Sequence, residues 1–436
     1  MENREQRPSR RSFMKSAVAA GTAYGAFSIL GTTAKGAGKK IKVGLVGCGG
    51  RGSGAVMQHM TAAKVLNDKL NMGIEIEVVA LADFDQGRCG RVGKRLKVPQ
   101  DRWFGGAKGY HKLLDLKPDI MLTAAPPVFR PVHFKAAIEA GCHVFMEKPV
   151  AVDAAGVRTI MEAGKLAEKK GLFVVAGTQR RHQQGYNQTA QEIQEGAYGR
   201  VMAGRVAWNM GRIFHNNPMN PSKPEDLCRG GNWQLWVEMS GDHICEQHVH
   251  NLDVANWYIG THPDNAGGFG HRVLRKAGNM YDFFSADLEY KVDGRSVYVH
   301  SMCRQVGNCW NWVGEQFTYE KSKPKDFKLS KPVCYSEIPQ MGGGHQQEHI
   351  NLLYYMMKGK YLNEAQSVAE ATGTAILARD AAFTGQRLRW DDLFVKPSKK
   401  NPELFNKQLK PTALDFETGN IAYPKDGDIY HPGKKA

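Results

Sequence analysis

A glycine-rich turn early in the chain has the spacing of a dinucleotide-binding loop. It follows an apolar run of strand length at 41–46 and precedes a helical pattern over 53–70. Glycines at such a turn let the backbone bend tightly and approach a pyrophosphate, while the helix N-terminus supplies amide donors and a partial positive charge. The residues expected to hold the phosphates are Gly47, Gly49, Gly50, Arg51 and Gly52.

An acidic residue ends the next predicted strand, which covers residues 76–82. The Asp83 carboxylate could accept hydrogen bonds from the adenosine ribose hydroxyls and would repel a 2′-phosphate, which favours NAD over NADP as the cofactor. The interval between Gly52 and Asp83 is longer than usual for this motif and indicates an insertion near residues 67–75. Alternatively, Asp83 only forms a turn, with Asp85 as the competing acid.

A stretch rich in histidine carries side chains that could bind a metal. His243, Cys245, His248 and His250 offer imidazole and thiol groups, which suit zinc. Their order matches no common zinc module, and on a helix they would not share one face. We therefore expect no metal site.

Strands and helices that could position these residues alternate in the first part of the chain. Further strand-like runs at 120–124, 142–146 and 172–176 are separated by helical patterns such as 131–140 and 153–170. This alternation predicts an α/β fold with an N-terminal Rossmann domain, a doubly wound parallel sheet with helices on both faces.

Beyond about residue 200 the strand-like runs become longer and less regular, which indicates a second α/β domain with a large, open, mainly antiparallel sheet. These runs are 201–209, 285–292 and 296–304, and later helices are expected at 346–357 and 367–384. The predicted divisions are a signal and linker at 1–40, a Rossmann domain at 41–170, a substrate and oligomerisation domain at 171–395, and an extended C-terminal arm at 396–436.

The first forty residues have the pattern of an export signal. The sequence SRRSFMK at 9–15 matches the twin-arginine motif, and the moderately apolar stretch at 16–31 is too short and weak for a stable membrane span. The signal predicts recognition by the twin-arginine export machinery and a location in the periplasm, or at a membrane outside the cytoplasm. The alternatives are a basic, poorly ordered tail or an uncleaved anchor.

The amino-acid composition limits the classes of protein to which this chain could belong. A chain of 436 residues with 42% hydrophobic residues can bury the cores of two domains. The net charge of +16 is partly carried by the signal, and no basic run is interleaved with stacking aromatics, which argues against nucleic acid as a partner. The eight cysteines form no CxxC pair and imply no disulfide framework.

Three segments resemble the Gfo/Idh/MocA family, named after glucose–fructose oxidoreductase, inositol dehydrogenase and a rhizopine-catabolism protein. The sequence AIEAGCHVFMEKP at 137–149 is similar to the family's AIEAGKHVxxEKP stretch. The sequence APP at 125–127, followed by His133, resembles its TP…H segment with Ala in place of Thr. The segment 246–257 resembles its DxxxHxxDxxxW element with Glu in place of Asp, and the whole resemblance covers about residues 41–391.

The resemblance implies roles for several residues. Lys148 would lie near the reacting hydroxyl, His250 would be the catalytic histidine, and Glu246 its acidic partner. The chemistry agrees, because a neutral His accepts a hydroxyl proton near neutral pH and a Lys stabilises charge developing on oxygen. On one helix the i, i+4 spacing would place Glu246 and His250 on the same face. The alternatives are a salt bridge for Lys148 and a hydrogen-bonded core position for His250. Further cofactor contacts are expected from Pro126, His133, Glu147 and Lys148.

Other side chains could line a carbohydrate pocket. Arg180 and Arg181 follow a strand end, where α/β proteins bind ligands, although salt bridges are an equal alternative. Trp233 and Trp236 suit stacking against a pyranose ring, with core packing as the alternative. Asp253 is expected to support the substrate site rather than to react.

Together these features predict an NAD-dependent oxidoreductase acting on a ring or chain hydroxyl of a sugar, glycoside or polyol. The resemblance also implies a homo-oligomer. Because a compartment outside the inner membrane offers no pool of nicotinamide nucleotide, we expect the cofactor to be tightly bound and recycled in place. The alternatives are an NAD-dependent glycosidase that acts by transient oxidation and elimination, and a non-catalytic sugar-binding protein.

Overall fold

The computed structural model describes residues 39–213, 215–333, 338, 340, 342–399 and 402–431. The predicted twin-arginine signal therefore lies outside the described residues, apart from its last two positions. None of the helices in the described ranges combines the length and apolarity needed to cross a bilayer.

The first domain is built on a six-stranded parallel sheet with the order β3-β2-β1-β4-β5-β6. Its strands are β1 (Lys39–Val46), β2 (Ile74–Asp83), β3 (Trp103–Gly105), β4 (Ile120–Thr123), β5 (His143–Met146) and β6 (Val174–Ala176). All residues of β4 and β6 are buried, as expected for parallel strands covered on both faces. The predicted Rossmann sheet is confirmed, and β6 completes it beyond the predicted boundary at 170.

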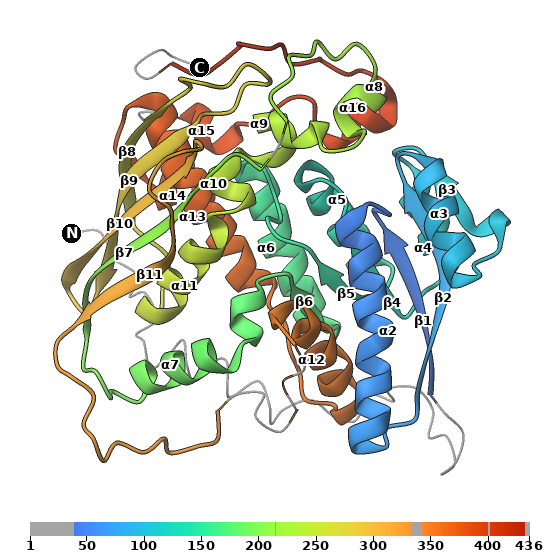
Figure 1. The fold of residues 1–436 in the computed structure, drawn as a ribbon, viewed down its shortest axis with the longest axis horizontal. Helices are drawn as coiled ribbons and strands as arrows, with labels where there is room; N and C mark the ends of the chain where they lie inside the picture. The colour runs from blue at the N-terminus through green and yellow to red at the C-terminus, as the bar shows by residue number, and fades with distance from the viewer. Residues whose placement is uncertain are drawn as a thin grey trace.

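The strand order reverses between β1 and β4, which opens the crevice where such sheets bind ligands. The helices of this layer are α2 (Gly50–Leu70), α3 (Gln86–Leu96), α4 (Gly109–Leu114), α5 (Arg130–Glu139) and α6 (Ala154–Lys169). The long interval before Asp83 is taken up by the 21 residues of α2 and the 10 residues of β2. Helix α12 (Gly344–Lys358), from late in the chain, packs against α2 (Figure 1).

The second domain carries a six-stranded mixed sheet with the order β11-β7-β10-β9-β8-β12. Its strands are β7 (Val201–Met210), β8 (Asn265–His271), β9 (Phe283–Val292), β10 (Arg295–Gln305), β11 (Trp312–Tyr319) and β12 (Leu388–Arg389). Every neighbouring pair is antiparallel except β7 and β10, which run parallel. The mainly antiparallel sheet is thus confirmed.

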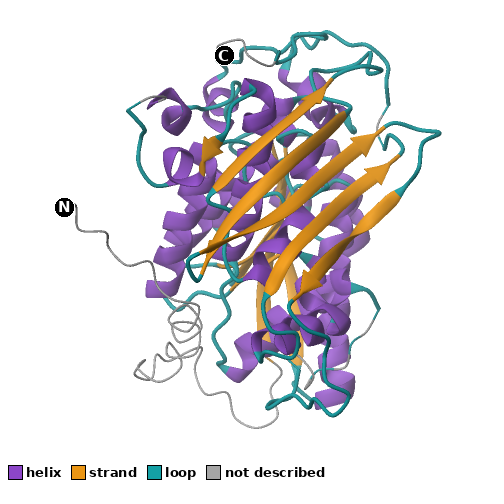
Figure 2. Ribbon diagram, turned by 90° about the vertical axis from the view of Figure 1, so that its left-hand side faces the viewer, coloured by secondary structure: helices purple, strands orange, loops and turns teal. Residues whose placement is uncertain are grey.

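Within the described residues, helices cover only one face of this second sheet. The helices α11 (Val249–Ile259) and α13 (Ala365–Thr384) pack together and against its inner face. Figure 2 shows the sheet from the opposite side, with the strands in front of the helices. Along β10 the side chains alternate, so that Val297 and Val299 are buried while Tyr298 is 55% exposed.

The C-terminal arm packs back over the molecule and is partly helical. It forms the short helices α15 (Pro402–Asn406) and α16 (Ala413–Thr418). In α16 the ring of Phe416 lies 5.0 Å from the ring of Phe129 in the first domain. The Tyr110 hydroxyl donates to Glu417 at 2.9 Å, so the arm ties the end of the chain to the Rossmann layer.

Candidate nucleotide cleft and catalytic site

The glycine-rich loop connects β1 to α2 with a geometry that only glycine tolerates at two positions. Gly47 has a φ of +92°, and a Cβ there would lie 2.5 Å from the backbone nitrogen of Ala125. A Cβ at Gly52 would lie 1.7 Å from the carbonyl oxygen of Gly47. At Gly49 and Gly50 a Cβ would meet nothing within 4 Å. The loop therefore packs on one side and leaves open space on the other.

This open side fits a pyrophosphate. Gly49 is the N-cap of α2, and no side chain caps the first amide groups of the helix. Those amides have no partner within the helix and carry the positive end of its dipole. They are available to the phosphates of a dinucleotide, as the motif predicts.

The two kinds of glycine should respond differently to alanine. Gly52→Ala is expected to destabilise the protein by about 3 kcal/mol, because the added methyl group collides with backbone. Gly49→Ala is expected to leave the melting temperature unchanged and to weaken NAD binding, because its methyl group enters the open side of the loop. Thermal denaturation and calorimetric NAD titration check both variants. Equal melting temperatures for the two would contradict the packing described here.

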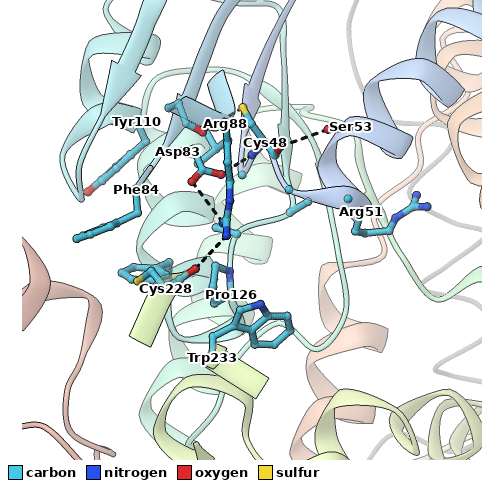
Figure 3. A pocket seen from close by; sticks show the side chains of 18 of the residues that line it. Cys48, Arg51, Ser53, Asp83, Phe84, Arg88, Tyr110, Pro126, Cys228 and Trp233 are labelled. Carbon is cyan, nitrogen blue, oxygen red and sulfur yellow. Dashed lines mark hydrogen bonds and ion pairs between the residues drawn. The ribbon is translucent and has the colours of Figure 1, made fainter. Parts of the chain in front are cut away.

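A cavity of about 670 Å³ extends from this loop along the carboxyl ends of the strands. Figure 3 shows Asp83 and Arg88 of the first domain in the upper part of the cavity, and Pro126 next to Trp233 of the second domain below them. The Arg88 guanidinium lies 3.6 Å from Asp83 Oδ1 and donates to the carbonyl oxygen of Cys228 at 3.4 Å. Residues of the second domain therefore contact the first domain and form one wall of the cleft.

Asp83 is the acid of this cleft. Its carboxylate accepts the backbone N–H groups of Cys48 at 2.7 Å and of Asp85 at 2.9 Å. Burial raises the pKa of Asp83, and these hydrogen bonds together with Arg88 oppose that rise. Asp85 instead caps α3 by accepting the N–H of Gly87 at 2.9 Å, and it does not line the cavity.

Of the other predicted cofactor residues, Pro126 and His133 line the cavity and Glu147 does not. Burial lowers the pKa of His133 to about 3, so this imidazole is neutral. Glu147 is 2% exposed and binds the guanidinium of Arg51. Arg51 also lies 3.5 Å from Glu348, and in Figure 3 its side chain points away from Asp83. The loop backbone and Arg51 both line the cavity, and Glu147 holds the Arg51 guanidinium.

Lys148 follows the end of β5 and meets the predicted acid. Its Nζ donates to Glu246 Oε1 at 3.1 Å and also to the backbone carbonyl of Glu246. Both side chains are 13% exposed. The expected single helix from Glu246 to His250 is wrong, because α10 (His243–Glu246) ends before α11 begins at Val249. This break matters, since carbonyls at a helix end lack intrahelical partners and can accept from Lys148.

His250 lies at the start of α11 and is 4% exposed. Burial lowers its pKa well below the usual value, and the charges of Lys148, Arg180 and His345 lower it further. The Nδ1 atom has no hydrogen-bond partner among the described residues. The ring stacks 5.8 Å from Trp208. A neutral imidazole with an unused nitrogen thus lies within electrostatic reach of Lys148 and can accept a proton.

The predicted substrate residues separate into different environments. Arg180 binds Glu315 and stays within electrostatic reach of His250. Arg181 forms two 2.9 Å hydrogen bonds with Asp253, an internal ion pair. The remaining two are tryptophans: Trp233 lines the nucleotide cavity, whereas Trp236 is 0% exposed in the core and offers no face to a sugar.

The histidine-rich stretch has other partners in the structure. His248 contacts the hydroxyl of Ser301 at 2.9 Å, and the ring of His243 packs against Phe284. In the part of the chain that the structure describes, no three His, Cys, Asp or Glu side chains are grouped as metal ligands.

Sequence reasoning missed three residues near these sites. Arg88 had a readable signal, because it lies one turn into the helix that follows Asp83. Trp208 and His345 had none, since their proximity to His250 depends on packing between segments far apart in the chain.

Comparison with known proteins relates this geometry to a family. A family model described as an oxidoreductase family with an NAD-binding Rossmann fold (GFO_IDH_MocA) matches residues 41–178, which include β2 to β6 and Lys148. Inositol 2-dehydrogenase of Acidothermus cellulolyticus is 26% identical over 244 residues, which are 55% of this chain and 60% of that protein. Inositol 2-dehydrogenase/D-chiro-inositol 3-dehydrogenase of Halalkalibacterium halodurans is 28% identical over 50% of this chain and 53% of its own length. The aligned region thus spans little more than half of these relatives.

Solved structures share the fold over most of their length. Levoglucosan dehydrogenase, in complex with NADH and levoglucosan, has a TM-score of 0.63 at 14% identity, covering 80% of this chain and 99% of that one. The WlbA dehydrogenase from Bordetella pertussis, in complex with NADH and UDP-GlcNAcA, has a TM-score of 0.60 at 18% identity with the same coverage. Residues 41–178 form a Gfo/Idh/MocA-type NAD-binding Rossmann domain of an oxidoreductase family.

Proposed function

We propose that this protein is an NAD-dependent oxidoreductase that oxidises a hydroxyl group of a sugar, glycoside or polyol. The observation that carries the proposal is the contact of Lys148 with Glu246, within electrostatic reach of the neutral, buried His250. The inositol and levoglucosan dehydrogenases among the similar proteins support a polyhydroxylated substrate.

In the proposed reaction the chain positions the alcohol and takes its proton. Lys148 donates a hydrogen bond to the reacting oxygen and stabilises its developing negative charge. His250 accepts the hydroxyl proton, and Glu246 holds the Lys148 ammonium in place. A nicotinamide cofactor held in the cleft lined by Gly47, Gly49 and Asp83 would supply the hydride acceptor. Turnover of a panel of polyols and sugars, followed by absorbance of reduced nicotinamide, tests the proposal; no reduction with any of them would overturn it.

The pH dependence should report the buried histidine. An unperturbed histidine with a pKa near 6.5 would be about three quarters protonated at pH 6. Because the pKa of His250 is lowered well below 6.5, its neutral form persists at pH 6. We expect kcat/KM to change little between about pH 8 and pH 6 and to fall only at lower pH. A profile of kcat/KM with an acid limb near pH 6.5 would contradict this assignment.

We also propose that the cofactor is held tightly and recycled in place. Support comes from the second domain, whose Cys228 carbonyl meets Arg88 and whose Trp233 faces the cavity. The protein as purified, without added nucleotide, should release about one NAD per chain on denaturation. Mass spectrometry of the supernatant measures this, and protein free of nucleotide would overturn the retention proposal while leaving the oxidoreductase assignment intact.

Export and assembly are two further proposals. The motif at 9–15 supports twin-arginine export to a place outside the cytoplasm. A reporter protein fused to residues 1–40 should be exported, and the double substitution Arg10→Lys and Arg11→Lys should block that export.

The uncovered sheet face, with Tyr298 and Phe269 exposed, supports a homo-oligomer. Light scattering of the purified protein tests the assembly.

A further inference from the structure

The C-terminal arm contacts both walls of the nucleotide cavity. Its residues 402–431 include α15 and α16 and run along the upper edge of the molecule, in red in Figure 1. The first-domain wall of the cavity includes three aromatic residues, Phe84, Tyr110 and Phe129. The second-domain wall is formed by residues between 228 and 234. The arm meets these two walls at separate places.

Helix α16 supports the aromatic wall. The ring of Phe416 lies edge-on to those of Phe129 and Phe84, with centroid distances of 5.0 and 6.0 Å. Phe416 is 6% exposed and does not itself line the cavity. The next residue, Glu417, accepts a hydrogen bond from the Tyr110 hydroxyl at 2.9 Å. Two consecutive residues of the arm therefore hold all three aromatic residues of this wall.

Asp426 holds the opposite wall. Its Oδ2 accepts the backbone N–H of Met219 at 2.5 Å, and its Oδ1 accepts the backbone N–H of Gly278. A Cβ at Gly278 would lie 2.0 Å from the carbonyl oxygen of Leu235, and the N–H of Asn279 donates to that oxygen at 3.1 Å. One carboxylate therefore joins the chain that leads into this wall to the loop that supports its far end.

The arm is anchored on both sides of these contacts. Before α16, the N–H of Leu409 donates to Asp153 Oδ2 at 2.9 Å. Near the end of the arm, the carbonyl oxygen of Tyr430 accepts the Tyr281 hydroxyl at 2.7 Å, and the Tyr430 ring stacks 4.3 Å from Phe383. A segment that is anchored at both ends and contacts both walls restrains their separation.

We propose that the arm acts as a strap that keeps the nucleotide cavity closed and slows the release of NAD, with Phe416 and Asp426 as its positioning residues. The inference rests on the proposed function, because it takes the cavity as the NAD site. The direct hydrogen bond between the walls, from Arg88 to the Cys228 carbonyl, is longer than usual at 3.4 Å. The contacts of the arm supply the further restraint that a retained cofactor needs.

The rate of NAD release tests the strap directly. The protein is incubated with isotopically labelled NAD, transferred into excess unlabelled NAD, and the bound label is followed over time by mass spectrometry. Phe416→Ala should release NAD about tenfold faster than the wild type, because two aromatic contacts that restrain the wall are lost. Asp426→Asn should release it about threefold faster, because an amide offers one acceptor oxygen where the carboxylate offers two.

Two variants in the same arm are matched controls. Leu414→Ala changes a residue of α16 that is 62% exposed, and Asp428→Asn changes an exposed carboxylate two positions from Asp426. Neither residue contacts a wall of the cavity through the bonds described above. Both variants should release NAD at the wild-type rate.

The melting temperature of each nucleotide-free variant separates restraint of the cavity from general stability. Wild-type release rates in Asp426→Asn and in folded Phe416→Ala would overturn the inference, even if their melting temperatures fell. Equally fast release from the two controls would also overturn it. If Phe416→Ala does not fold, Asp426→Asn decides. No substrate is turned over in this assay, so its outcome is independent of the proposed oxidation, which the formation of reduced nicotinamide tests.

Discussion

Replacing Lys148 by methionine is expected to lower kcat/KM by about 10²–10³-fold, the loss typical of removing one donor to a developing oxyanion. Methionine keeps most of the side-chain volume and removes the ammonium group, so the ends of β5 and α10 stay filled. Because Lys148 contacts Glu246 and is absent from the lining of the nucleotide cavity, NAD binding should change little. Steady-state kinetics with the best substrate of the panel and calorimetric NAD titration measure the two effects.

A surface lysine provides the control for this variant. Lys135 is 55% exposed and pairs with Glu139 on the same helix, a contact worth a few tenths of a kcal/mol. Lys135→Met should keep the wild-type rate and stability. If Lys148→Met turned over substrate as fast as Lys135→Met, Lys148 would be a structural ion pair, and the proposed oxyanion role would be lost.

The Rossmann half could be predicted from the sequence because its signals are local. Each parallel strand is a short apolar run, buried on both faces, and helical periodicity separates one run from the next. The geometry of the glycine loop is also determined locally, because the positive φ of Gly47 and the close approach of Gly52 to the Gly47 carbonyl both lie within six residues. The right-handed crossovers expected between parallel strands then decide on which face of the sheet each helix lies.

The contacts of the site depend on residues distant in the chain, and these could not be predicted. Arg51 belongs to the phosphate loop by sequence, yet Glu147 and Glu348, 96 and 297 residues away, hold its guanidinium. The break between α10 and α11 likewise has no local helix breaker, since Gln247 and His248 are ordinary helix residues. Tertiary packing determines both the partners of Arg51 and the break between α10 and α11. The parallel pairing of β7 with β10, which are separated by nearly a hundred residues, likewise depends on tertiary packing.

Two histidines two positions apart in one segment, His248 and His250, should separate effects on turnover from effects on stability. The Nδ1 atom of His250 has no hydrogen-bond partner among the described residues and lies within electrostatic reach of Lys148, whereas the nitrogens of His248 contact Asn251 at 3.2 Å and Ser301 at 2.9 Å. We expect His250→Gln to lower kcat by about 10²–10⁴-fold, the contribution of a positioned proton acceptor, with little change in melting temperature.

His248→Gln should behave in the opposite way. Breaking its buried hydrogen bonds is expected to cost about 1–3 kcal/mol of unfolding free energy, while turnover by the folded fraction stays near the wild-type rate. Urea denaturation and kinetics on the same preparations measure both quantities. A His250→Gln variant that lost stability and kept its rate would make His250 a core histidine, and the proton acceptor would then have to be sought at His345, the other neutral imidazole within reach of Lys148.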